Sequence, residues 1–90
     1  MPHIMIRVTA EDYDSWVAVH NSCVEARKDY GLSDGPLYRD VADPNAALVH
    51  LVAEDLDRAM GWFKDPRFRE ANAKVSLVGP RELYFAEKRG

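Results

Sequence analysis

The segment Ala47-Leu48-Val49-His50-Leu51-Val52-Ala53 has the pattern of a β-strand that is buried on both faces. Successive side chains of a strand point to opposite sides, so Leu48, His50 and Val52 share one face and the other four residues share the second. Neither face is polar apart from the histidine, which is typical of a strand at the centre of a sheet. One layer of helices covers only one face of a sheet, so the segment predicts that a partner covers the other.

A β-hairpin accounts for the residues before this strand. Residues 38–42 form the predicted first arm, and Asp43-Pro44-Asn45 forms the turn. Asp stabilises the first turn position through its side chain, Pro presets φ at the second, and Asn tolerates the third. The hairpin, residues 36–55, therefore supplies one central strand and one neighbouring strand.

The remaining elements place this hairpin in a β-α-β-β-α-β order. A strand is predicted at residues 3–9, a helix at 11–30, a helix that begins near Asp55 and restarts at Asp65-Pro66, and a last strand at 83–87. This order is that of the ferredoxin-like split βαβ fold, an α+β fold with a four-stranded antiparallel sheet and both helices on one face. We expect a single domain over residues 1–90.

Two polar side chains, His20 and Arg27, fall inside the apolar stripe of the helix predicted at 11–30. At about 100° per residue, they share one side of this helix with its apolar and aromatic residues. That side contains Tyr13, Trp16, Val17, His20, Cys23, Val24, Arg27 and Tyr30, and the opposite side contains Asp14, Ser15, Ser22, Glu25, Lys28 and Asp29. Both side chains are therefore expected to face the sheet, roughly 10 Å apart along the helix axis.

Composition narrows the class of protein. The formal net charge is −3, and Lys and Arg are scattered along the chain, which argues against nucleic-acid binding. The apolar runs are far too short to span a membrane. One cysteine, Cys23, forms no internal disulfide, and the N-terminal residues lack a signal-peptide pattern. We expect a cytoplasmic protein.

Short motifs distributed over nearly the whole chain resemble those of a known superfamily. They are residues 13–16 with His20 and Arg27, Gly31, residues 38–40, 43–45 and 54–56, Asp65-Pro66, and Val78-Gly79-Pro80. On these motifs the chain resembles the dimeric α+β barrel superfamily, and within it short proteins related to antibiotic biosynthesis monooxygenases. The resemblance implies a homodimer whose sheets face each other as a barrel. It also implies a small cavity between sheet and helices in each subunit. Similar proteins include cofactor-free monooxygenases, lactone isomerases and haem-degrading enzymes. The haem-degrading ones use a histidine of the second helix as the iron ligand, and no histidine occurs from Leu51 onward, so we expect no cofactor.

Five residues are candidates for a site in that cavity. His20, with a pKa near its ordinary value, is the candidate general base, and Arg27 is the candidate anchor for an oxyanion or carboxylate. We predict these two as catalytic residues. Trp16 and Trp62 are candidates for the walls, and Arg39 is a candidate for binding an anionic substrate.

A structural interpretation of the same residues stays open. Arg27 could form a buried ion pair with Asp40 or Glu54, and His20 could be satisfied within the core or at the dimer interface. No histidine pair has short metal-ligand spacing, so no metal site is predicted.

Two functions are therefore compatible with the sequence. One is an enzyme-like protein that binds a small aromatic or cyclic carbonyl compound, as a cofactor-free monooxygenase or as an isomerase or cyclase. The other is a non-catalytic homodimer that binds a metabolite or a protein.

Overall fold

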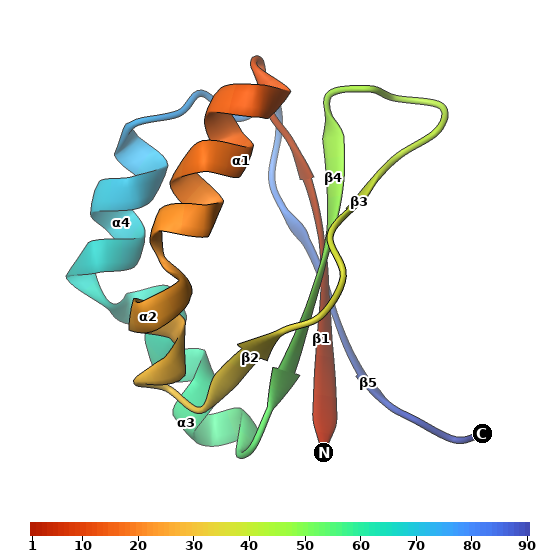
Figure 1. Cartoon of the computed structure of the whole chain (residues 1–90), viewed down its shortest axis with the longest axis vertical. Helices are drawn as coiled ribbons and strands as arrows, with labels where there is room; N and C mark the ends of the chain where they lie inside the picture. Colours follow the sequence, from red (N-terminus) through yellow and green to blue (C-terminus); the bar gives the residue numbers. More distant parts are fainter.

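The computed structural model describes all 90 residues, and its elements follow the predicted order with additional breaks (Figure 1). In chain order they are β1 (Pro2–Thr9), α1 (Tyr13–Ser22), α2 (Val24–Lys28), β2 (Leu32–Asp34), β3 (Tyr38–Arg39), β4 (Ala46–Ala53), α3 (Leu56–Met60), the 3-10 helix η1 (Gly61–Lys64), α4 (Pro66–Ala73) and β5 (Glu82–Glu87).

The strands form one antiparallel sheet in the order β2-β4-β1-β5, and β3 also pairs with β4. The predicted central strands, β1 and β4, are the central strands of the structure. The expected first hairpin arm at 38–42 is shorter than predicted, because the edge of the sheet is divided between β2 and β3. Pro36 lies between these strands and lacks the N–H that a continuous ladder requires. The ferredoxin-like α+β fold is confirmed.

The helices all lie on one side of the sheet (Figure 1). Asp12, Asp55 and Asp65 cap α1, α3 and α4 through side-chain oxygens that accept backbone N–H groups. Pro66 occupies the first turn of α4, where its missing N–H costs nothing, so the predicted helix restart is confirmed. None of the helices combines the length and the apolar character that crossing a membrane requires.

The helix expected at 11–30 is interrupted at Cys23, where φ is −100° and ψ is 10°. The break separates α1 from α2 but leaves the predicted apolar stripe facing the sheet. Trp16, Cys23 and Arg27 are buried, whereas the side predicted to be polar is exposed.

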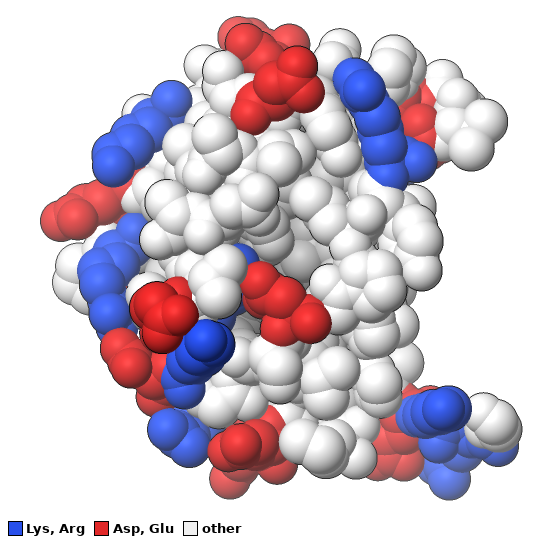
Figure 2. All heavy atoms as spheres, viewed as in Figure 1, with Lys and Arg blue, Asp and Glu red and all other residues white.

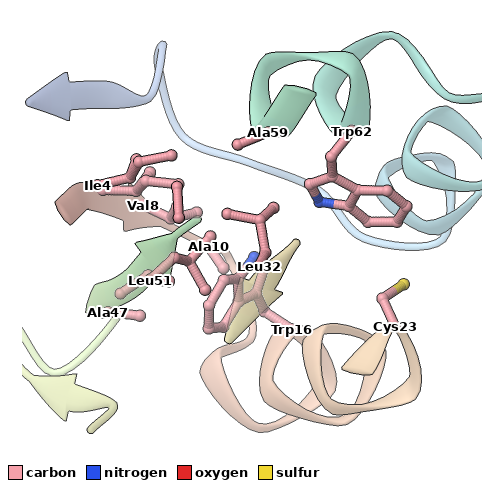
Figure 3. Packing of buried hydrophobic residues seen from close by; sticks show 13 residues of the cluster. Ile4, Val8, Ala10, Trp16, Cys23, Leu32, Ala47, Leu51, Ala59 and Trp62 are labelled. Atoms are coloured by element: carbon pink, nitrogen blue, oxygen red, sulfur yellow. The ribbon is translucent and has the colours of Figure 1, made fainter. Parts of the chain in front are cut away.

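The core lies between the helices and the inner face of β1 and β4. Ile4, Ile6 and Val8 come from β1, and Val49 and Leu51 come from β4. Figure 3 shows how Trp16 from α1 and Trp62 from η1 approach the core from the helical side.

The outer face of the sheet carries no helix (Figure 1). Met5, Leu48, Tyr38 and Tyr84 are exposed there, and Tyr84 pairs with Met5 across β5 and β1. His3 and His50 also lie on this face, where the rings stack and His3 Nδ1 lies 2.7 Å from His50 Nε2. The two-sided apolar character of β4 therefore leaves an apolar surface on the molecule.

Candidate functional site

A cavity of about 60 Å³ lies between the helical layer and the inner face of the sheet. Its walls are mostly apolar and include Ile6, Val49 and Phe63. On the face shown in Figure 2, the hollow between helices and sheet is bordered mostly by uncharged residues, with an acidic and a basic side chain at its rim. An apolar pocket with a few converging polar groups is the usual form of a small-molecule site.

Four of the five predicted site residues line this cavity. Trp16 and His20 come from α1, Arg27 comes from α2, and Trp62 comes from η1. Trp16, His20 and Arg27 face the cavity because they lie on the apolar side of α1 and α2. Trp62 faces it from the 3-10 helix η1, which precedes Asp65. The structure thus brings together residues that are up to 46 positions apart, from Trp16 to Trp62.

Arg39 lies elsewhere. Its guanidinium carbon is 4.2 Å from the centroid of the Tyr13 ring, and its Nε donates to the carbonyl oxygen of Pro44. These contacts hold the loop between β3 and β4 against the start of α1. Arg39 is exposed and is absent from the cavity walls, so the structure separates it from the other four residues.

Arg27 is 2% exposed, and each of its three side-chain nitrogens donates a hydrogen bond to a protein oxygen. Its Nε and Nη2 donate to the two carboxylate oxygens of Asp34 at 2.9 and 2.8 Å, and its Nη1 donates to the carbonyl oxygen of His20 at 2.9 Å. This bidentate geometry joins α2 to β2 and neutralises the guanidinium charge.

The partners predicted for Arg27, Asp40 and Glu54, are wrong. Asp40 accepts from Arg7 at 3.0 Å, and Glu54 lies 3.7 Å from Arg58. Asp34 is the partner because it ends the short strand β2, which lies beside α2 and brings the carboxylate to the guanidinium.

His20 stacks on Trp16, with ring centroids 4.9 Å apart and an angle of 13° between the planes. Burial, together with the positive charge of Arg27, lowers the pKa of the His20 imidazole to about 4. The prediction of a pKa near the ordinary value is therefore wrong, because the charged form is desolvated. At pH 7 the ring is neutral, and it offers one donor and one acceptor to the cavity.

Two cavity residues, Asn72 and Arg81, were not anticipated from the sequence. Arg81 Nη2 donates to Asn72 Oδ1, and the guanidinium carbon lies 4.9 Å from the centroid of the Phe68 ring. Burial lowers the pKa of Arg81 below its usual range. Arg81 belongs to the connection before β5, where helical periodicity gives no information. Its position directly after the Gly79-Pro80 turn is the only sequence signal that could have singled it out.

Metal-ligating side chains do not converge in this fold. No three residues of the His, Cys, Asp and Glu types come together as a group that could hold an ion. Cys23 lies in the cavity wall as a buried free thiol.

The ion pair between Arg27 and Asp34 predicts an asymmetric effect on stability. Asp34→Ala should lower the free energy of unfolding by about 3–5 kcal/mol, because it leaves a buried guanidinium without its counter-charge. Arg27→Met should cost roughly 1–3 kcal/mol, because the Asp34 carboxylate can still reach water. Urea denaturation measures both values.

Lys28→Met is the control for this pair, since Lys28 contacts Glu25 on the exposed side of the same helix. It should change stability very little. If Arg27→Met leaves stability unchanged while ligand binding is lost, Arg27 serves the site and not the fold.

His20 predicts a pH dependence of stability. Because its pKa is about 4 in the folded chain and near 6.5 when unfolded, the unfolded state binds the extra proton first as the pH falls. The free energy of unfolding should be highest above pH ~6.5 and should decrease by up to ~3 kcal/mol toward pH ~4. Urea denaturation as a function of pH tests this decrease.

The variant His20→Gln should remove the decrease in that pH range. Asp12, Asp40 and Asp65 act at lower pH, because hydrogen bonds to their ionised forms lower their pKa values. An unchanged pH profile in His20→Gln would show that His20 is not the group responsible.

Comparison with known proteins identifies the fold. No family model and no curated protein matches the sequence. Among solved structures, a candidate antibiotic biosynthesis monooxygenase from Bordetella bronchiseptica superposes with a TM-score of 0.79 at 16% identity, covering 98% of this chain and 96% of that one. SnoaB, a cofactor-independent oxygenase from Streptomyces nogalater, gives a TM-score of 0.73 at 15% identity, covering 99% and 93%.

A third structure, described as an antibiotic biosynthesis monooxygenase, covers the full length of both chains with a TM-score of 0.78 at 11% identity. At these identities the likeness concerns the fold. The chain therefore has the ferredoxin-like α+β fold of antibiotic biosynthesis monooxygenase-like proteins.

Proposed function

We propose that this protein binds a small planar aromatic or cyclic carbonyl compound in the cavity between helices and sheet. The observation that carries the proposal is the cavity itself, in which Trp16 and Trp62 supply aromatic walls and His20, Asn72 and Arg81 supply polar groups. Flat aromatic surfaces favour a planar ligand, and the few polar groups fix its orientation.

The enzymatic form of this proposal is a cofactor-free monooxygenase-like or isomerase-like activity. SnoaB, which shares the fold, is a cofactor-independent oxygenase. In this chain a neutral His20 can accept a hydrogen bond from an acidic hydroxyl or activated C–H group of the ligand. Its low pKa makes it a weak base, so the substrate itself must ionise readily.

A specific observation favours the alternative, a non-catalytic binding protein. Arg27, predicted as catalytic, donates three hydrogen bonds to protein oxygens, and the Asp34 carboxylate already offsets its charge. Measuring both oxygen consumption and product formation with ionisable aromatic carbonyl compounds separates the two forms. An oxygenase consumes oxygen, an isomerase converts its substrate without oxygen, and a binding protein does neither.

Filling the cavity tests the binding site. Ala71 lines the cavity, whereas Ala73 is exposed on the same helix, α4. Ala71→Phe should weaken binding of a single-ring aromatic carbonyl compound roughly tenfold or more by occupying its space, and Ala73→Phe should have no effect. Quenching of tryptophan fluorescence measures the affinity. Equal affinities in both variants would place the ligand elsewhere.

We also propose a homodimer formed through the outer face of the sheet. Met5, Leu48, Tyr38 and Tyr84 expose apolar surface there and border a groove of about 410 Å³. The groove is flanked by Arg7 and Glu82, one residue of each charge, which suits contact with a second copy. Exposed apolar faces of this kind mark interaction sites in soluble proteins.

Sedimentation at micromolar concentration should give a dimer. Leu48→Asp should produce a monomer of reduced stability, because folding and association are linked. Val78→Asp is the control, since Val78 is also exposed but lies outside the sheet. A wild-type chain that remains a stable monomer at micromolar concentration contradicts this proposal.

A further inference from the structure

The cavity walls contain positively charged side chains but no negatively charged ones. No Asp or Glu lines the cavity, and its titratable residues include His20, Arg27 and Arg81. His20 is neutral at pH 7, and the charge of Arg27 is matched by Asp34. Arg81 is thus the one cavity side chain with a positive charge that no carboxylate offsets.

Arg81 differs in this respect from most arginines of the chain. Carboxylate partners lie within 4.0 Å of Arg7, Arg27, Arg58, Arg67 and Arg89. Arg39 and Arg69 are exposed, so water can solvate them. Arg81 alone is half-buried and unpaired with an acid, and a charge in that position favours an anion beside it.

The Arg81 guanidinium is held in place on two sides. Asn72 accepts one of its five N–H groups, and the Phe68 ring lies beneath its plane. Asn72 is itself fixed, because its Nδ2 donates to the carbonyl oxygen of Phe68 at 2.7 Å. Four N–H groups of Arg81 remain for other acceptors.

The backbone before Arg81 is also fixed. Val78 N donates to the carbonyl oxygen of Thr9 at 2.8 Å, and Leu77 forms a bridge with Ala10. Gly79 has φ of 73°, a conformation that glycine adopts without strain and that turns the chain toward β5. Because this turn is attached to the end of β1, a ligand would meet an arginine that is already in position.

We infer that Arg81 selects ligands with a negatively charged oxygen, such as a carboxylate or phenolate, and orients that oxygen toward α4. The inference rests on the proposed small-molecule function and adds the charge of the ligand to it. An aromatic ring bearing the anion would lie in the cavity that Trp16 and Trp62 line, and the anionic oxygen would accept from the free N–H groups of Arg81. Planar recognition of carboxylates is a general property of the guanidinium group.

Benzoate and benzamide form a matched pair of probes, because they have nearly the same shape and only benzoate is ionised at neutral pH. Titrations followed by ¹H–¹⁵N NMR detect binding up to millimolar dissociation constants at the indole signals of Trp16 and Trp62. The wild-type protein should bind benzoate roughly tenfold or more tightly than benzamide. Added NaCl should weaken benzoate binding and leave benzamide binding unchanged.

Three variants assign this preference to Arg81. Arg81→Gln should abolish the preference for benzoate, whereas Arg81→Lys should retain part of it, because the charge remains without the planar fork. Arg69→Gln removes the same charge from the exposed side of α4 and should leave the preference intact. The NMR spectra of each variant also show whether it is folded.

The outcomes separate this inference from the function on which it rests. Equal binding of the two probes, or a preference that survives Arg81→Gln in a folded protein, overturns the role of Arg81 and leaves the cavity as a ligand site. Absence of binding by both probes at the Trp16 and Trp62 signals overturns the proposed function together with the inference.

Discussion

The structure depends on one constraint, which is that β4 is apolar on both faces while the helices cover only one of them. The inner residues Val49 and Leu51 pack against the helical layer and form the core with β1. Leu48 on the outer face has no helix to pack against and is partly exposed. In a chain of 90 residues the core alone gives a modest stability margin, so burying this second face in a partner would benefit both folding and solubility.

The cavity follows from the same arrangement, because a layer of short, interrupted helices does not fill the space above the sheet completely. The break at Cys23 separates α1 from α2, and the break at Asp65 separates η1 from α4. The two arginines that line this cavity, Arg27 and Arg81, differ in how their charges are balanced. Arg27 donates two hydrogen bonds to Asp34, which offsets its charge and joins α2 to β2, whereas Arg81 donates only one and has no carboxylate partner. Burial of a charge is tolerated in the first case by its partner and in the second by partial access to water.

Much of this fold could be predicted from the sequence because its signals are local and periodic. The caps at Asp55 and Asp65, the stripe that contains His20 and Arg27, and the central position of β4 all follow from spacing along the chain. The partner of Arg27 could not be predicted in this way. Asp34 lies on a three-residue strand whose pairing is decided by β4, and such a strand has too few residues to show a period.

The sequence predicts the orientation of the His20 side chain correctly but not its protonation state. Helical periodicity places the ring in the interior, but its pKa depends on the depth of burial and on the distance to a charge seven residues away, which are properties of the folded chain. His20 is neutral and the charge of Arg27 is offset by Asp34, so neither supplies an unmatched charge to the cavity. Any electrostatic recognition must therefore come from Arg81, which donates to Asn72 of α4 from the connection before β5. The sequence places no periodic signal in that connection, so this part of the site emerges only from the tertiary structure.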